Sequence, residues 1–201
     1  MPNGSLNSFL FSKSEDVEKL LDWTTRFQII RGTARGLVYL HEECRDRIIH
    51  CDIKPENILL DGDFSPKVAD FGLAKLVGRN FSRVLTTTRG TRGYLAPEWI
   101  SGLPITPKVD RGNILGVVDA RIASEVNTQE VRRAAVIAGL CIQDDENQRP
   151  SMSEVIKILE GTMEASVPQI PRSLQVLAGQ VDDNDSCSQH VSIANGSVYT
   201  E

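Results

Sequence analysis

Three short strings in this sequence carry residue types that could do chemistry, and they follow one another along the chain. The first is His50-Cys51-Asp52-Ile53-Lys54-Pro55-Glu56-Asn57, the second is Asp70-Phe71-Gly72, and the third is Ala96-Pro97-Glu98. Carboxylate and amide oxygens suit Mg²⁺, a hard cation that combines a few protein oxygens with phosphate and water. A lone Asp or Asn in a loop, however, is usually a turn former. Residue types alone leave a metal-dependent site and ordinary turns both open.

The order and spacing of the three strings favour the chemical interpretation. Together they resemble a protein kinase, in which H-x-D-x-x-x-x-N, D-F-G and A-P-E mark the catalytic loop, the metal loop and the activation segment. The amino-acid sequence at 37–41 and 90–98 further resembles that of plant receptor-like serine/threonine kinases, of the group with S-locus or lectin-type ectodomains. The resemblance covers roughly residues 1–110 and 117–175, as part of a kinase domain.

The resemblance implies ATP- and Mg²⁺-dependent transfer of phosphate to a Ser or Thr of a protein substrate. Such transfer is mostly positioning and charge stabilisation around the γ-phosphate oxygens. As the catalytic residues, Asp52 would accept or orient the proton of the substrate hydroxyl, and Lys54 would place its ammonium on the transferring phosphate. Asn57 and Asp70 would supply oxygen ligands to Mg²⁺ and thereby bind the ATP.

Other matching positions imply structure or regulation. His50 would brace the loop, and Glu98 would pair with Arg149. Cys51 stands where many kinases have an arginine that pairs with a phosphorylated activation segment. That segment holds four threonines in a basic stretch, which are either phosphorylation sites or plain loop residues: Thr86, Thr87, Thr88 and Thr91. Thr91 near A-P-E, with Lys two after Asp52, resembles the serine/threonine branch.

Several elements that would position these residues are predicted from periodicity and capping signals. Apolar residues spaced three or four apart predict a helix that begins after Asp22, with one inward face: Trp23, Phe27, Ile30, Ala34, Leu37 and Leu40. Gly32 and Gly36 on this helix indicate close packing against another element. Runs at 48–49, 58–60 and 67–69 predict strands, with a turn at 61–63.

Two more helices are predicted further along the chain. One covers 131–142, with an inward face of Val131, Ala134, Ala135, Ala138 and Cys141. Another begins at Ser151, where Glu154 completes a capping box. Together with these elements, the resemblance implies an α+β fold, the mainly α-helical C-lobe of a kinase-like fold with small β-hairpins and without an N-lobe.

Composition narrows the partners and the compartment. A net charge of −5 gives no general attraction to nucleic acid, and 40% hydrophobic residues argue against a wholly disordered chain. The four cysteines form no C-x-x-C pair, so no zinc or redox motif is indicated. No run approaches the roughly 20 apolar residues of a membrane span, and the first residues do not form a signal peptide. The expectation is a cytoplasmic chain, without direct membrane insertion, whose parent family lies at the cytoplasmic face of the plasma membrane.

Two departures from the kinase pattern bear on activity. The sequence contains neither a G-x-G-x-x-G-x-V loop nor a V-A-I-K lysine. After Asp110, where the family continues into a long apolar helix, the chain has only the short stretch 111–119. If that helix buries about six apolar side chains at roughly 1.5–3 kcal/mol each, its loss rivals the net stability of a domain.

The sequence thus predicts a partial kinase domain over 1–175, with an internal gap near 110–116, and a disordered tail over 176–201. As a function it predicts a receptor-like serine/threonine kinase by family that is inactive or strongly impaired as this isolated chain. The alternatives are a non-catalytic interaction module, with a full-length receptor-like kinase as partner, and an incomplete gene product.

Overall fold

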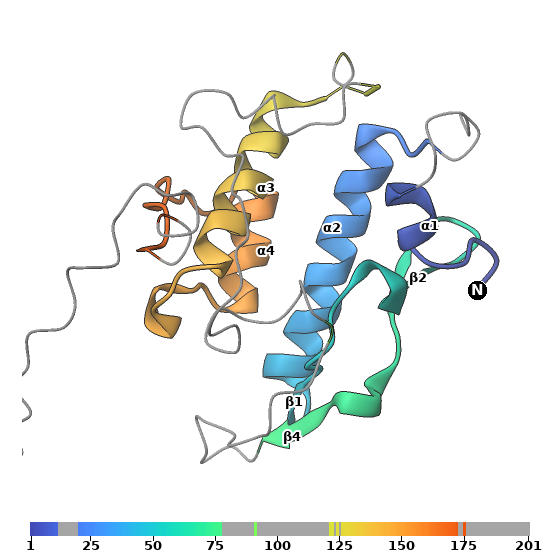
Figure 1. Ribbon diagram of the computed structural model, residues 1–201, viewed down its shortest axis with the longest axis horizontal. Coiled ribbons are helices and arrows are strands. Elements are labelled where there is room, and N and C mark those ends of the chain that lie inside the picture. Colours follow the sequence, from blue (N-terminus) through green and yellow to red (C-terminus); the bar gives the residue numbers. More distant parts are fainter. Residues whose placement is uncertain are drawn as a thin grey trace, which may run out of the picture.

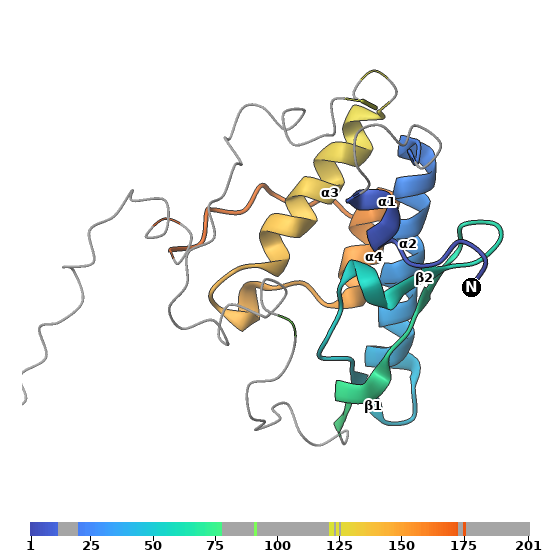
Figure 2. The same cartoon turned by 45° about the vertical axis from the view of Figure 1, so that its right-hand side comes forward.

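The computed structural model describes residues 1–11, 20–77, 91, 121–122, 124, 126–172 and 175. Its α-helices are α1 (Asn7–Leu10), α2 (Trp23–Val38), α3 (Thr128–Cys141) and α4 (Met152–Glu160). Strand β1 (Arg47–Ile49) pairs with β4 (Lys75–Val77), and β2 (Ile58–Leu60) pairs with β3 (Pro66–Val68), both antiparallel. In Figures 1 and 2, α2 lies between the α3–α4 pair and the strands. The predicted α+β combination of helices and small antiparallel strand pairs is confirmed, although only β2 and β3 form a hairpin.

The helix ends follow from local capping chemistry, as predicted. The Asp22 carboxylate accepts a hydrogen bond from the amide of Thr25 at 2.7 Å and so begins α2. Ser151 and Glu154 form a reciprocal capping box at the start of α4, with the Ser151 amide donating to the Glu154 carboxylate at 2.8 Å. Gly161 ends α4 in the left-handed conformation, with φ of 73°. These caps satisfy backbone groups that a helix end leaves without partners.

Helix α2 buries side chains on two sides rather than one. Ile29 is 2% exposed and packs against a small cluster with Leu21, Ile58 and Leu60. The other side of α2 packs against α3 and α4 in a larger cluster: Trp23, Phe27, Ala34, Ile122, Val131, Ile137, Val155, Ile158 and Leu159. The prediction that Ile30 faces inward is wrong, because Ile30 is 37% exposed. A helix with packing partners on two sides does not follow a single apolar stripe.

The two glycines of α2 are explained by the approach of β3, which confirms the predicted close packing. A Cβ atom at Gly32 would lie 2.6 Å from Cγ of Pro66, far inside van der Waals contact. At Gly36 it would lie 3.6 Å from a methyl group of Val68, which is an ordinary contact. Only Gly32 is therefore required for the helix to pack this closely on the strand.

The predicted inward face of α3 is partly wrong. Ala138 and Cys141 are exposed, whereas Val136 and Ile137 are buried together with Val131. Burial on this helix follows the branched side chains, which remove more apolar area from water than alanine does.

Two predictions about the organisation of the chain concern residues outside those described. They are the interior stretch near 110–116 and the tail over 176–201. Within the part of the chain that is described, no helix combines the length and the apolar character needed to cross a membrane.

Candidate active site

The side chain of His50 connects the segment 50–57 with the segment around Asp70. Its side chain is 1% exposed, and its Nδ1 accepts a hydrogen bond from the amide of Asp52 at 3.3 Å. Because Nδ1 is an acceptor here, the proton of the neutral ring is assigned to Nε2, which donates to the carbonyl of Ala69 at 2.8 Å. The ring also packs edge-on against Phe71, with centroids 4.9 Å apart. His50 thus holds the loop of Asp52 against the loop of Asp70, as a bracing residue would.

The Asp52 carboxylate is the most heavily engaged group of the site. It is buried, and each of its oxygens accepts hydrogen bonds. The amide and hydroxyl of Thr91 donate to Oδ1 at 3.0 and 2.7 Å. The ammonium of Lys54 lies 2.9 Å from Oδ2, and the Asn57 side-chain amide donates to the same oxygen at 3.3 Å. A buried carboxylate is costly without such partners, so this arrangement keeps it ionised.

The protonation state of this pair follows from opposing effects. Burial by itself raises the pKa of the Asp52 carboxyl, but the hydrogen bonds from Lys54 and Thr91 outweigh burial and lower the pKa below its ordinary value of 3.8. The hydrogen bond to Asp52 likewise raises the pKa of Lys54 above 10.5, helped by the charges of Glu56 and Asp70. Both directions agree that Asp52 and Lys54 are charged at neutral pH.

Lys54 and Thr91 reach Asp52 by different routes. The backbone at Lys54 is extended, with φ of −157° and ψ of 162°, and its ammonium reaches Oδ2 of Asp52, two residues earlier in the same loop. Thr91 comes from a distant part of the chain, and its hydroxyl also accepts a 2.7 Å hydrogen bond from Lys54. The sequence contains Thr91 as a candidate but gives no sign of this three-residue contact.

Asn57 and Asp70 have the right donor chemistry for Mg²⁺. The Asn57 side-chain nitrogen donates to the Asp52 carbonyl at 2.9 Å, which leaves its amide oxygen for another partner. Asp70 is exposed, and one of its oxygens accepts a 3.2 Å hydrogen bond from the amide of Gly72. The amide of Ala69 donates to the carbonyl of Asn57 at 2.9 Å, so Asp70 follows directly after a residue bound to Asn57. Two hard oxygen donors on adjoining segments fit a cation that takes its remaining ligands from phosphate and water.

Among the described residues, no group of three or more His, Cys, Asp and Glu side chains gathers as a metal site. Asn57 and Asp70 would therefore hold Mg²⁺ only together with phosphate oxygens. Three of the candidate threonines (Thr86, Thr87 and Thr88) and Glu98 lie outside the described residues. Arg149, the expected partner of Glu98, donates from Nε to the carbonyl of Gln143 at 2.8 Å.

Cys51 occupies a special backbone position in this loop. Its φ of 67° lies in the left-handed region that non-glycine residues seldom adopt. Burial raises the pKa of its thiol, with Lys75 acting in the opposite direction to a smaller extent. A neutral thiol cannot make the ion pair with a phosphate that an arginine would make there.

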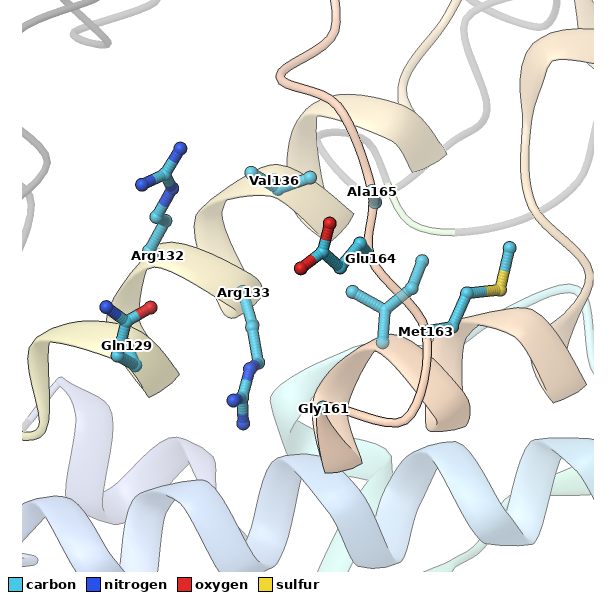
Figure 3. A pocket seen from close by; sticks show the side chains of 9 residues that line it. Gln129, Arg132, Arg133, Val136, Gly161, Met163, Glu164 and Ala165 are labelled. Carbon is cyan, nitrogen blue, oxygen red and sulfur yellow. The ribbon is translucent and has the colours of Figure 1, made fainter.

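A pocket of about 290 Å³ lies elsewhere, between the first turns of α3 and the end of α4. Figure 3 shows Gln129, Arg132 and Arg133 on α3 and Glu164 on the segment that follows α4. Arg133 donates to the carbonyl of Leu159 at 3.4 Å. None of the lining residues belongs to 50–57 or 70–72, so this pocket is separate from the candidate active site.

Comparison with known proteins agrees with the geometry around Asp52. The model of the protein kinase domain family matches residues 1–118, which is more than half of the chain. This chain belongs to the protein kinase family. The loop of Asp52, the loop of Asp70 and Thr91 of this kinase chain all lie inside the matched residues.

The kinase chain is also similar to individual plant proteins. Three G-type lectin S-receptor-like serine/threonine-protein kinases of Arabidopsis thaliana are 52%, 49% and 46% identical to it. The matches cover 92%, 88% and 87% of this chain but only 27%, 28% and 24% of the relatives. The chain thus spans about a quarter of the length of these relatives. It is a receptor-like serine/threonine kinase by family, as the sequence predicts.

The alignment of the kinase chain with the first of these relatives is longer than the chain itself. The aligned stretch counts 225 positions, although the whole chain has only 201 residues. Part of the relative's aligned segment therefore has no counterpart in this chain.

Proposed function

We propose that the cluster of Asp52, Lys54 and Thr91 serves transfer of the γ-phosphoryl group of ATP to a Ser or Thr hydroxyl of a protein. The observation that supports this best is the buried, ionised Asp52 carboxylate, whose Oδ1 already accepts a hydroxyl hydrogen bond from Thr91 at 2.7 Å. A carboxylate that can hold one hydroxyl can orient a second one for attack.

The low pKa of Asp52 decides how it would act. A carboxylate with a pKa below 3.8 is a weak base at neutral pH, so early removal of the substrate proton is unfavourable. Its role in the proposal is to aim the hydroxyl oxygen at phosphorus. As the new O–P bond forms and the bond to the ADP oxygen breaks, the hydroxyl becomes acidic and its proton passes to Asp52.

Lys54 and the two oxygen ligands have complementary roles in the proposal. The Lys54 ammonium would stabilise the negative charge of the transferring group, which is the kind of pre-placed stabilisation that enzymes use most. Asn57 and Asp70 would hold Mg²⁺, which would offset the negative charge of the phosphate groups.

We also propose that the 201-residue chain by itself transfers phosphate at or near background. The alignment with the first relative supports this proposal, because the relative's aligned segment contains positions that this chain lacks. Their loss would remove packing and positioning around the site. The sequence predicts that the stretch near 110–116 is where they are missing. Loss of even one pre-placed donor costs on the order of 10²–10³ in rate.

A phosphotransfer assay with Mg·ATP and a general protein substrate tests this proposal. Asp52→Asn provides the blank, because it keeps the size of the side chain and removes the negative charge. The proposal expects the chain and its Asp52→Asn variant to give equal, background signals. Sustained turnover by the chain above that blank would show that the chain is active alone.

The alternative is a non-catalytic module that binds another kinase through its folded surfaces. The extensive packing of α2 against α3 and α4 favours it, because this packing does not involve Asp52. A purified kinase domain from one of the relatives is a suitable probe. Binding that survives Asp52→Asn favours the module, and absence of binding relative to a scrambled chain eliminates it. For the whole protein, we propose protein substrates and attachment to the plasma membrane.

A further inference from the structure

A pocket of about 280 Å³ lies between α2 and the turn that joins β2 to β3. Its polar and apolar walls come from both elements: Gln28, Arg31 and Arg35 on the helix, and Asp63, Phe64 and Ser65 on the turn. No lining residue belongs to the Asp52 loop or to 70–72, so any ligand here is bound apart from the candidate active site.

The two arginines of this pocket carry an N–H donor for which the surrounding residues that the structure describes provide no acceptor. They are four residues apart and therefore lie on the same side of α2. Both donate to a single oxygen of Glu160 on α4, Arg31 at 3.3 Å and Arg35 at 2.5 Å. The Nε–H group of Arg31 is buried and, in the described structure, has no hydrogen-bond partner. A buried donor without an acceptor is unfavourable, and a ligand that supplies one relieves that cost.

The pocket between α3 and α4 differs in this respect. There the guanidinium of Arg133 lies against Gly161, where a Cβ atom would be 2.6 Å from its central carbon. It also donates to the carbonyl of Leu159 at the end of α4. A cation at a helix C-terminus stabilises the helix by its charge and its hydrogen bond. Arg133 thus has a structural explanation, whereas the unpaired donor of Arg31 has none.

We propose that the pocket between α2 and the β2–β3 turn binds the carboxylate of an acidic segment in a partner protein. A carboxylate can accept from two N–H groups on one edge of a guanidinium. The Nε–H of Arg31 is closed to solvent in this structure, so the Arg31 side chain has to turn toward the pocket before a carboxylate engages this edge. Arg35 is largely exposed and would supply a second cation. Phe64 gives the pocket an apolar wall, against which the carbon chain of a glutamate packs.

Two negative charges set limits on this binding. Glu160 already accepts from both arginines, and Asp63 stands on the opposite wall. The partner's carboxylate must therefore approach the arginines and avoid Asp63. We expect affinity that is modest, falls with added salt, and increases when Asp63 loses its charge.

Titration of the ¹⁵N-labelled full chain tests the proposal through its arginine Nε–H signals. The probe is a short peptide of glutamates with one leucine, and the matched peptide carries glutamine in place of each glutamate. The signal of Arg31, assigned from its loss in Arg31→Lys, should shift with the glutamate peptide and stay in place with the glutamine peptide. Inorganic phosphate is titrated in parallel. A response to phosphate as strong as the response to the peptide would contradict peptide binding and indicate a simple anion site.

Variants place the binding at this pocket. Arg35→Ala should weaken binding about tenfold, as expected for loss of one charge-assisted contact, and Arg35→Lys should weaken it less. Asp63→Asn should strengthen it. Arg132→Ala removes one exposed positive charge at the other pocket and should leave binding unchanged. Equal weakening by Arg132→Ala, or no effect of Arg35→Ala in a chain whose thermal unfolding is unchanged, would overturn the proposal. Asp52→Asn should bind the peptide normally, so a failed phosphotransfer proposal would leave this one standing.

Discussion

The hydroxyl of Thr91 donates a 2.7 Å hydrogen bond to the carboxylate of Asp52, although 39 residues separate them in the sequence. The Thr91 amide donates to the same oxygen at 3.0 Å. Thr91 thus fixes the orientation of the carboxylate on which the proposed chemistry depends. It also brings a distant part of the chain against the loop of Asp52, so the position of Thr91 affects the geometry of that loop.

Removing the Thr91 hydroxyl should raise the pKa of Asp52. Thr91→Ala deletes one of the hydrogen bonds that lower this pKa, whereas Thr91→Ser keeps a hydroxyl in place. A ¹³C titration of the Asp52 carboxyl, assigned with Asp52→Asn, measures the effect. We expect a higher pKa in Thr91→Ala and a nearly unchanged one in Thr91→Ser. The same pKa in all three chains would mean that this hydroxyl does not contact the carboxylate in solution.

The lowered pKa of Asp52 also makes stability depend on pH. Its ionised form is favoured in the folded state, so the stabilisation is fully present above the ordinary pKa of 3.8. It is lost as the pH falls below 3.8 and through the lower folded-state pKa. Denaturant unfolding of the chain and of Asp52→Asn at a series of pH values checks this. The free-energy difference between them should shrink on acidification, and a difference that is independent of pH would contradict the assignment.

The two glycines of α2 should respond differently to alanine. Gly32→Ala places a Cβ atom 2.6 Å from Pro66 and should destabilise the fold by about 1–3 kcal/mol, as overpacking does. Gly36→Ala, one turn later, meets Val68 at 3.6 Å and should be neutral or stabilising by up to about 1 kcal/mol, because alanine favours helix. Urea unfolding of both variants gives the comparison. Equal effects would show that β3 does not approach α2 at Gly32.

His50→Phe should destabilise the fold while preserving the aromatic contact with Phe71. The substitution leaves the carbonyl of Ala69 and the amide of Asp52 without their partner, at about 1–3 kcal/mol for each group that stays buried. His50→Gln, which can restore one of the two hydrogen bonds, should lie between the two chains in thermal unfolding. Wild-type stability in His50→Phe would exclude a bracing role.

Local chemistry accounts for what the sequence could predict. The caps at Asp22 and Ser151 depend on neighbours within three residues. The turn at 61–63 depends on neighbours within four residues, because Asp61 accepts from the amides of Asp63 and Ser65. The strings around Asp52 and Asp70 could also be identified from the sequence, because the family's motif residues stand at fixed spacing. These features require no knowledge of what packs against the segment.

Tertiary contacts account for what the sequence could not predict. Ile29 rather than Ile30 is buried because β2 and β3 lie on a second side of α2, and no periodicity within the helix reveals them. The partner of His50 is a backbone carbonyl at Ala69, which any residue type would supply. The hold of Thr91 on Asp52 spans elements whose proximity depends on the whole fold. Sequence patterns identify such residues only as candidates.

The central claim is that Asp52 carries phosphoryl transfer, and that this chain lacks interior positions needed to express it. The most direct measurement compares phosphotransfer from Mg·ATP by the 201-residue chain with that by a chimera in which the 52%-identical Arabidopsis relative completes its kinase domain. Both are assayed with Asp and with Asn at position 52. The account predicts activity only in the completed chain, and its loss in Asp52→Asn. Activity of the completed chain that survives Asp52→Asn, or Asp52-dependent turnover by the 201-residue chain alone, would contradict it.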